Sequence, residues 1–264
     1  MNEFRSPLTA DANAGLVALV TGGGTGIGRA TALELARTGA GVAVCGRRSE
    51  LLDETRTAIE AAGGQCLALP ADVREPEQVD ALVDAVLERF GRIDVLVNNA
   101  GGQFIAAAEE ISPNGWRAVH RLNVDAVWYL TRLVATRSMI PNGSGLVVFI
   151  GLSPRRALPG MAHASAARAA VENLGRTLAV EWGRYRIRTV TVTPGVIRTE
   201  GLDGYGEEAV EEWEREVPLG RLGSPEEIAS VIAFLASPGG AYVSGTTLLV
   251  DGGIDAMGLG RLPA

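Results

Sequence analysis

A glycine-rich run near the start of the chain has the composition of a phosphate-binding loop. Residues 21–28 are TGGGTGIG, so Gly22, Gly26 and Gly28 form the pattern G-x-x-x-G-x-G, with Thr25 and Ile27 between them. Without side chains the backbone can approach a pyrophosphate, and the amino-terminal end of the following helix favours its negative charge. The run therefore predicts a dinucleotide site, although glycines in this pattern can also serve a structural turn.

Two arginines near the end of the second predicted strand bear on which dinucleotide binds. Sites for NAD usually carry an acidic side chain there, which binds the 2′-hydroxyl of the ribose. Here Arg47 and Arg48 follow Gly46 instead. A guanidinium can pair bidentately with the 2′-phosphate of NADP. The sequence thus favours NADP(H) over NAD(H), the alternative being that both arginines are solvated residues at the start of a helix.

The composition excludes several kinds of chemistry. All 24 basic residues are arginines, so no lysine is present to form a Schiff base. The two cysteines, Cys45 and Cys66, cannot form a disulfide framework or a CxxC zinc site. His120 and His163 are the only histidines, and we predict no metal site. The formal charge of −7, without a basic block, argues against nucleic acid or an anionic membrane as the main partner.

The elements that must position these residues alternate between strand and helix. Short, continuously apolar runs are typical of strands buried on both faces, and helical patterns separate them. This alternation predicts an α/β fold, a Rossmann-like doubly wound sheet of about seven parallel strands with helices on both faces. The predicted strands are Leu16–Thr21, Val42–Cys45, Cys66–Pro70, Ile93–Asn98, Leu146–Ile150, Ile187–Thr193 and Thr246–Val250; the predicted helices are Ile27–Thr38, Ser49–Ala62, Glu75–Phe90, Trp116–Met139, Ala162–Trp182 and Pro225–Ala236.

The 264 residues fit one domain, predicted over residues 15–255 with an N-terminal extension at 1–14 and a C-terminal tail at 256–264. The start shows no secretion signal, and no apolar run approaches the ~20 residues of a membrane span. We therefore expect a cytoplasmic protein. Residues 194–224 form a long irregular stretch that we interpret as a substrate lid. The acidic helix predicted within it at Glu207–Glu216 is either part of that lid or a solvated surface helix.

Several motifs taken together resemble the short-chain dehydrogenase/reductase family over about residues 15–253. They are the glycine run, Asp72-Val73, Asn98-Asn99-Ala100-Gly101 and the segment PGVIRT at 194–199. The resemblance implies that the following residues border the cofactor: Asp72 and Val73 at the adenine, Asn98, Ala100 and Gly101 along the cofactor, Pro194 and Gly195 in the last motif, and Ile197 and Thr199 at the nicotinamide carboxamide.

Finer features resemble one branch of that family. The segments at 101–104 (GGQF), 112–116 (SPNGW) and 163–171 (HASAARAAV) are similar to those of peroxisomal trans-2-enoyl-CoA reductases and 2,4-dienoyl-CoA reductases. This resemblance implies a small-molecule substrate that is a thioester of coenzyme A or of a carrier protein. Family members usually form homodimers or homotetramers, here through the helices predicted around Trp128, Leu174 and Leu178.

The usual catalytic residues of the family are missing. The family relies on a Ser, a Tyr-x-x-x-Lys and an Asn. Matching the sequence after the Lys puts Arg168 at its position, Ala164 at the Tyr and Gly151 at the Ser, and only Asn123 survives. The dienoyl-CoA reductases carry their Tyr earlier in the chain, at the position that Ser153 occupies here.

This loss favours one reaction over another. Reduction of a ketone produces an alkoxide that needs a positioned acid, and loss of that acid costs roughly 10²–10⁴-fold in rate. Conjugate reduction of an enoyl thioester instead requires stabilisation of the enolate oxygen, which donors that do not titrate can supply. The sequence therefore predicts an NADPH-dependent reductase of an activated C=C bond.

Four residues are the candidates for catalysis. Arg168 can donate to ribose hydroxyls and place a positive charge near the nicotinamide, but it cannot act as an acid at neutral pH. Asn123 can kink its helix and hold a water molecule, and Ser153 can donate to a substrate oxygen. His163 is the nearby titratable side chain. Each also has a structural alternative as a surface, capping or packed residue.

Other functions remain open at this point. Arg155 and Arg156 could contact the phosphates of coenzyme A, although the acidic lid opposes a bulky anionic substrate. Tyr129 is more typical of a core or interface residue, and Tyr205 lies in the predicted lid. The alternatives are non-redox chemistry in specialised metabolism, a redox-inactive nucleotide-binding protein, and ketone reduction with an improvised acid.

Overall fold

The computed structural model describes residues 5–152 and 157–257, apart from the side chains of residues 203–205, 207 and 209. Within these residues seven parallel strands form one sheet in the order β3-β2-β1-β4-β5-β6-β7. This architecture confirms the predicted Rossmann-like fold. The strands are β1 Val17–Thr21, β2 Gly41–Gly46, β3 Cys66–Pro70, β4 Val95–Asn98, β5 Gly145–Ile150, β6 Ile187–Pro194 and β7 Thr246–Val250.

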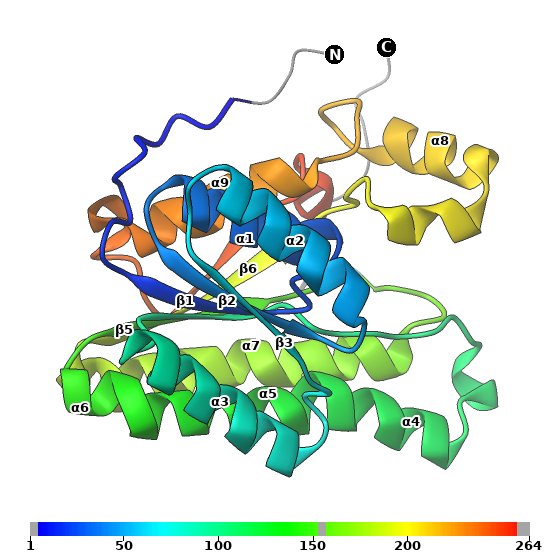
Figure 1. The fold of residues 1–264 in the computed structure, drawn as a ribbon. Coiled ribbons are helices and arrows are strands. Elements are labelled where there is room, and N and C mark those ends of the chain that lie inside the picture. Colours follow the sequence, from blue (N-terminus) through cyan, green and yellow to red (C-terminus); the bar gives the residue numbers. More distant parts are fainter. Residues whose placement is uncertain (1–4, 153–156, 258–264) are drawn as a thin grey trace.

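Helices cover both faces of the sheet (Figure 1), with α1, α2 and α9 on one face and α3, α5 and α7 on the other. Among the described residues, no helix combines the length and the hydrophobicity needed to cross a bilayer. The helices are α1 Gly26–Arg37, α2 Ser49–Ala61, α3 Pro76–Phe90, α4 Pro113–His120, α5 Ala126–Val134, α6 Ile140–Asn142, α7 Ala162–Trp182, α8 Glu207–Glu216 and α9 Pro225–Ala236.

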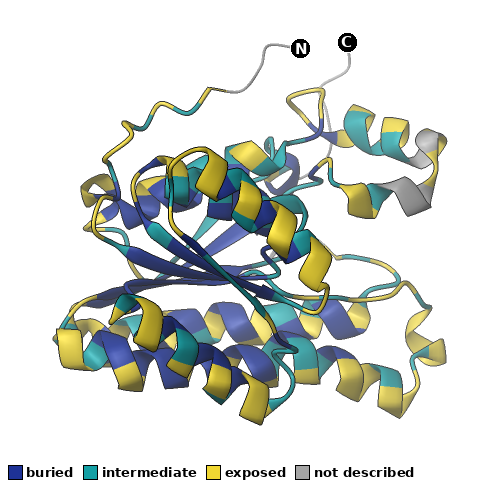
Figure 2. Cartoon of the chain, viewed as in Figure 1, coloured by how far each residue is buried: buried dark blue, intermediate teal, exposed yellow. Residues whose placement is uncertain are grey.

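The strands are mostly apolar because each face of the sheet belongs to a different core. In β1, Leu19 packs with the α3, α5 and α7 layer, whereas Ala18 and Val20 pack with the α1, α2 and α9 layer. All five residues of β1 are buried, and Figure 2 shows the central strands as a buried layer between the helices. The edge strands β3 and β7 are the most exposed of the seven.

One predicted helix differs from its observed bounds by more than one residue. It was expected at Trp116–Met139, but the helical run begins at Pro113 because the Ser112 hydroxyl accepts a hydrogen bond from the Gly115 amide at 3.0 Å. Proline suits the first helical position, where its missing N–H has no partner to lose. The run then passes through π-helical turns at Arg121–Asp125 and Ala135–Met139 before it ends at Asn142.

The predicted lid contains regular structure. A 3₁₀ segment at Glu200–Tyr205 leads into α8, whose bounds match the predicted acidic helix. Arg198, just beyond β6, forms an ion pair with Glu214 of α8. This pair links the helix to the end of the sheet, and Figure 1 shows α8 lying off the edge of the two helical layers.

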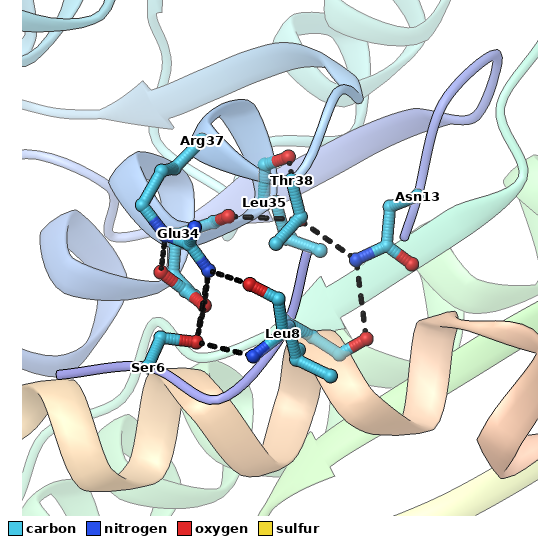
Figure 3. A network of polar contacts seen from close by, with 8 residues as sticks. Ser6, Leu8, Asn13, Glu34, Leu35, Arg37 and Thr38 are labelled. Atoms are coloured by element: carbon cyan, nitrogen blue, oxygen red, sulfur yellow. Dashed lines mark hydrogen bonds and ion pairs between the residues drawn. The ribbon is translucent and has the colours of Figure 1, made fainter. Parts of the chain in front are cut away.

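The segment before β1 is attached to the fold by polar contacts with α1 and α9 (Figure 3). The Asn13 side chain donates to the Thr38 hydroxyl at 2.8 Å and to the Ala233 carbonyl at 3.1 Å. Nearer the surface, the Ser6 hydroxyl donates to Glu34, and Arg37 donates to the Leu8 carbonyl. The part of the N-terminal extension that the structure describes therefore packs on the domain.

Candidate active site

A cavity of about 530 Å³ opens where β1, β2, β3 and β4 end. The carboxyl ends of parallel strands share one edge of the sheet, and the strand order reverses at β1 and β4, where α/β folds bind ligands. The cavity brings together predicted residues from distant parts of the chain. From the predicted set it is lined by Gly22, Thr25, Gly26, Ile27, Arg47, Arg48, Asp72, Val73, Ala100, Gly101, Arg168 and Thr199.

The glycine loop has the geometry of a cradle for phosphate. Gly22 and Gly26 have φ values of +66° and +51°, a region that favours glycine. A Cβ at Gly28 would lie 2.2 Å from the Gly22 carbonyl oxygen and 2.5 Å from Asn99 Nδ2. Asn99 in turn donates from Nδ2 to the Thr21 carbonyl at 2.8 Å, which fixes the loop against the end of β4. This backbone is open enough for a pyrophosphate, so the residues fit a dinucleotide.

Positive charge gathers at the β2 end of the cavity. Arg47 and Arg48 are exposed and line it. Asp72 is paired with Arg74, whose guanidinium donates to both of its carboxylate oxygens. This hydrogen bonding, assisted by the charge of Arg47, lowers the pKa of Asp72 to about 2. Because Arg74 already neutralises Asp72, and Arg47 and Arg48 pair with no carboxylate among the described residues, this end is suited to an anionic group.

Arg168 projects from α7 into the other end of the cavity. Its Nη1 donates to the Ile150 carbonyl at 2.7 Å, at the end of β5. A Cβ at Gly101 would lie 2.0 Å from Arg168 Nη2, so the guanidinium occupies space that only a glycine leaves open. Burial lowers the pKa of Arg168 to about 10. Within the described residues no carboxylate pairs with this cation, and its remaining N–H groups are available to a ligand.

Asn123 lies in the π-helical turn at Arg121–Asp125, and its side chain is beside that of Arg168 of α7. Its Nδ2 donates to the Gly102 carbonyl at 2.8 Å and to the Val119 carbonyl at 2.9 Å. Its Oδ1 would be 2.8 Å from a Cβ at Gly101. The helix has a π-helical turn at this residue, and the side chain fixes the loop after β4 against this helix. Asn123 is therefore a positioning residue for the wall that Arg168 contacts.

The positions matched to the family Ser and Tyr are closed by packing. A Cβ at Gly151 would lie 2.3 Å from Thr193 Oγ1 and 2.9 Å from Thr191 Cγ2. Thr193 is only 1% exposed, and its hydroxyl has no hydrogen-bond partner among the described residues. Ala164 is buried in a small apolar cluster with Val119. A side chain at residue 151 would therefore have to displace its neighbours.

Some predicted residues lie away from the cavity wall. Asn98 points into the core, where its Nδ2 donates to the Thr131 hydroxyl at 2.9 Å. A Cβ at Gly195 would lie 2.7 Å from the Cα of Asp251, so this glycine permits close approach of the segment after β7. Pro194 pairs with Val250 in the sheet. Ile197 lines a second cavity of about 480 Å³ beside the segment after β6.

Among the other candidates, His163 is fully buried and contacts Phe104 rather than lining the cavity. Tyr129 donates to Asp80 of α3, remote from the cavity lining. Ser153, Arg155 and Arg156 lie outside the described residues, as does the side chain of Tyr205.

Sequence reasoning missed several residues of the cavity. Arg74, Asn99, Gln103, Leu122 and Glu200 also line it. The motif around Asn98 could have indicated Asn99, because it includes that residue. Gln103 and Leu122 carry no such signal, since their place depends on the path of the loop after β4 and on the π-helical turn.

Comparison with known proteins gives consistent matches. Residues 22–255 match a family model described as enoyl-(acyl carrier protein) reductase. A peroxisomal 2,4-dienoyl-CoA reductase of Arabidopsis thaliana is 38% identical over 262 residues, covering 94% of this chain and 87% of that protein. Gluconate 5-dehydrogenase of Gluconobacter oxydans is 38% identical over 243 residues, covering 91% and 94%.

A solved structure from Beutenbergia cavernae also has the same fold. That protein is assigned as an NAD(P)-dependent gluconate 5-dehydrogenase and contains NADP at low occupancy. It is similar to this chain with a TM-score of 0.87 and 37% identity, and the match covers 92% of this chain and 98% of that one. The relatives thus include reductases of a C=C bond and dehydrogenases of a sugar acid.

Proposed function

This chain belongs to the short-chain dehydrogenase/reductase family of oxidoreductases, and we propose that it reduces the activated C=C bond of an enoyl thioester with NADPH. The observation that carries the proposal is the Arg168 guanidinium, which enters the cavity without a carboxylate partner in the described residues. The Arabidopsis relative, a dienoyl-CoA reductase, supports the thioester substrate.

The residues along the cavity are suited to NADP(H). The backbone at Gly22 and Gly26 would hold the pyrophosphate, and Arg47 and Arg48 would pair with the 2′-phosphate. Thr199 lines the cavity beyond the glycine loop and would face the carboxamide of the nicotinamide. When bound, the dihydronicotinamide would supply a hydride to the β-carbon of the substrate, and water would supply the proton that the α-carbon takes up.

Arg168 would stabilise the negative charge that develops on the thioester oxygen. A fixed cation with unused N–H groups, partly removed from water, stabilises an enolate without giving up a proton. Its bond to the Ile150 carbonyl holds the guanidinium in place before the reaction. Asn123 would keep the neighbouring loop at the distance that this arrangement needs. Ser153, outside the described residues, stays part of the proposal as a second donor.

The same site is poorly suited to ketone reduction. An alkoxide must receive a proton from a positioned acid, and arginine does not supply one at neutral pH. The matched positions of the family hydroxyl groups hold Gly151 and Ala164, which carry none. The gluconate 5-dehydrogenase relative makes carbonyl reduction the competing activity to test.

The proposal is tested by the consumption of NADPH with a short and a long 2-enoyl-CoA and with a panel of ketones and sugar acids. Binding of NADPH is first measured by fluorescence. We expect turnover of the thioesters, loss of roughly 10²-fold or more in kcat/KM for Arg168→Met, and little turnover of ketones. Turnover of ketones alone, or tight NADPH binding without any turnover, would overturn it.

We also infer a homo-oligomer. Trp128 on α5 is 41% exposed and Val180 on α7 is 83% exposed, so both helices present apolar side chains to the surface. Leu178 does not contribute, because it is 2% exposed and packs within the core of its own subunit. Light scattering of the purified protein, with Trp128→Glu as the variant expected to dissociate it, tests this assembly.

A further inference from the structure

His163, near the start of α7, is a buried polar side chain whose ring nitrogens find no partner in the part of the chain that the structure describes. Its exposure is 0%, and neither Nδ1 nor Nε2 has a hydrogen-bond partner among the described residues. The adjacent cluster of Val119, Ala164 and Ala167 is apolar. A buried imidazole without hydrogen bonds destabilises the fold, and such groups are rare unless they serve a function.

Phe104 forms the cover over this imidazole. The two rings meet edge to face, with centroids 4.2 Å apart and an interplanar angle of 67°. Phe104 is itself 41% exposed, so it lies between the buried His163 and the surface. The preceding residue, Gln103, lines the nucleotide cavity. The ring that covers the imidazole therefore directly follows a residue of the cavity wall in the chain.

The Phe104 ring also rests against Gly115, where an added Cβ would lie 2.9 Å from Phe104 Cζ. The loop that carries it has no regular secondary structure and is fixed to the chain before α7 by a hydrogen bond from the Ala106 amide to the Gly160 carbonyl, 3.0 Å long. That bond does not involve Phe104. Ile105, at 58% exposed, and Trp116, at 41% exposed, extend the apolar surface beside it. An acyl chain would find an apolar surface where the ring now lies.

We infer that His163 is a substrate-binding residue and that Phe104 is the cover which the acyl chain displaces. The neutral imidazole provides one donor and one acceptor. Its N–H donates to an acceptor oxygen of the substrate, either the thioester carbonyl or an amide of the thioester arm. The substrate then supplies the hydrogen bond that the imidazole lacks within the described residues. This inference rests on the proposed thioester substrate and assigns the residues that recognise it.

The cover is tested by chemical modification, because the chain has only two histidines. Diethyl pyrocarbonate labelling of the whole protein, followed by mass spectrometry, reports each separately. His120 is half-buried beside Trp116 and serves as the internal standard. We expect Phe104→Ala to raise the labelling rate of His163 by about tenfold or more, without a change at His120. Phe234→Ala, which removes an equally exposed ring on α9, is the matched control. Unchanged labelling of His163 in Phe104→Ala would overturn the inference.

Contact with the substrate is tested by two variants and by a ring signal. His163→Phe fills the same apolar space, so a structural role predicts wild-type kcat/KM and a higher Tm. Our inference predicts the higher Tm with a loss of about 10²-fold in kcat/KM on 2-enoyl-CoA, partly recovered in His163→Gln, which keeps a donor. The ¹⁵N signal of the His163 ring should shift when saturated acyl-CoA is added to the NADP⁺-loaded protein, whereas that of His120 should not.

The outcomes separate this inference from the proposed function. Thioester turnover with full activity in His163→Phe overturns the role of His163 and leaves the proposed function standing. Absence of thioester turnover in the unmodified enzyme overturns the proposed function. In that case an unmoved ring signal overturns the inference too, while a shifted one supports acyl recognition by His163.

Discussion

The buried charge of Arg168 destabilises the fold, and in the proposed function the same charge is needed for activity. Burial lowers its pKa to about 10, which means that the native state destabilises the charged form. We expect Arg168→Met to raise the free energy of unfolding by on the order of 1–2 kcal/mol while it lowers kcat/KM. Urea unfolding and the NADPH assay measure the two effects on the same protein.

Arg188 is the matched control for this substitution. It too is partly buried with a lowered pKa, but its guanidinium donates to the carbonyls of Leu235, Gly240 and Val243. Arg188→Met removes this donor from all three carbonyls, of which that of Gly240 keeps its bond from the Val243 amide, so we expect destabilisation by about 1–3 kcal/mol. A loss of stability in Arg168→Met similar to that in Arg188→Met would contradict the view that Arg168 is retained for ligands.

Asp72 should make the fold sensitive to acid. Its pKa in the native protein, about 2, lies below the ordinary value of 3.8, so the unfolded chain binds the proton first as the pH falls. The stabilisation is therefore complete above pH 3.8 and is lost as the pH falls through about 2. In the wild-type protein the free energy of unfolding should fall between pH 3.8 and about 2, and Asp72→Asn should make this fall smaller by on the order of 1 kcal/mol. Urea unfolding at several acidic pH values measures it, with Asp53→Asn, at a 59% exposed position, as the control.

Gly151 should resist replacement by the family serine. Its Cβ would lie 2.3 Å from Thr193 Oγ1, so Gly151→Ser should lower the free energy of unfolding by about 1–3 kcal/mol. Removing that hydroxyl in Gly151→Ser/Thr193→Ala should recover most of the loss, since the remaining contact with Thr191 is longer at 2.9 Å. Thermal unfolding of both variants and of Thr193→Ala tests the coupling. If the two substitutions simply add, the packing argument is wrong.

At the scale of elements, strands were easier to predict than helix bounds. The segments Cys66–Pro70 and Thr246–Val250 were predicted with their observed ends, because Gly64 and Pro70 bound the first and Gly245 and Gly252 bound the second. The helical run after Ser112 was predicted to start later, since its first turn contains proline and glycine and is mostly exposed. Its π-helical turns have no periodic signal, because they depend on contacts such as that of Asn123 with Gly102.

Part of the candidate site could also be predicted from the sequence. Glycine spacing and the two arginines after β2 identify the nucleotide end, because they act through backbone shape and charge. The contact between Phe104 and His163 could not be predicted, since it joins two residues 59 positions apart through an irregular loop. Asn98 shows a second limit of prediction from the sequence, because a motif does not say where each of its side chains points. Its motif suggested the cofactor, but its side chain points to Thr131.

The turn between β1 and α1 gives a prediction at this scale. Gly28→Ala would place a Cβ 2.2 Å from the Gly22 carbonyl oxygen, so the glycine loop must shift. We expect the dissociation constant for NADPH to rise at least about tenfold. Fluorescence titration measures it. The control is Gly183→Ala, where φ is −54° and no atom lies within 4 Å of the added Cβ. Equal affinity in the two variants would contradict the role of the loop.

For the whole molecule, the arrangement separates the elements that stabilise the fold from those that bind ligands. The cavity and the long segments after β4 and β6 lie where strands end, and the N-terminal segment lies where β1 begins. The chain as a whole carries a net charge of −7, yet four arginines line the cavity against two carboxylates. Positive charge is therefore concentrated at the cavity, although the chain as a whole is acidic. An anionic cofactor is attracted to the cavity more than to the rest of the surface.

A substitution of Asn13 tests whether the stabilising and the ligand-binding elements are separate, because the Asn13 side chain joins the N-terminal segment to α9. Its side chain is 1% exposed and donates to Thr38 and to the carbonyl of Ala233, 220 positions later (Figure 3). Asn13→Ala leaves both buried acceptors with one partner fewer, so the free energy of unfolding should fall by about 1–3 kcal/mol. Because these contacts lie away from the cavity, kcat/KM and the dissociation constant for NADPH should not change. Ser6→Ala in the more exposed part of the same network should cost less than about 0.5 kcal/mol. A loss of NADPH affinity in Asn13→Ala at temperatures where it is fully folded would show that the N-terminal segment also shapes the site.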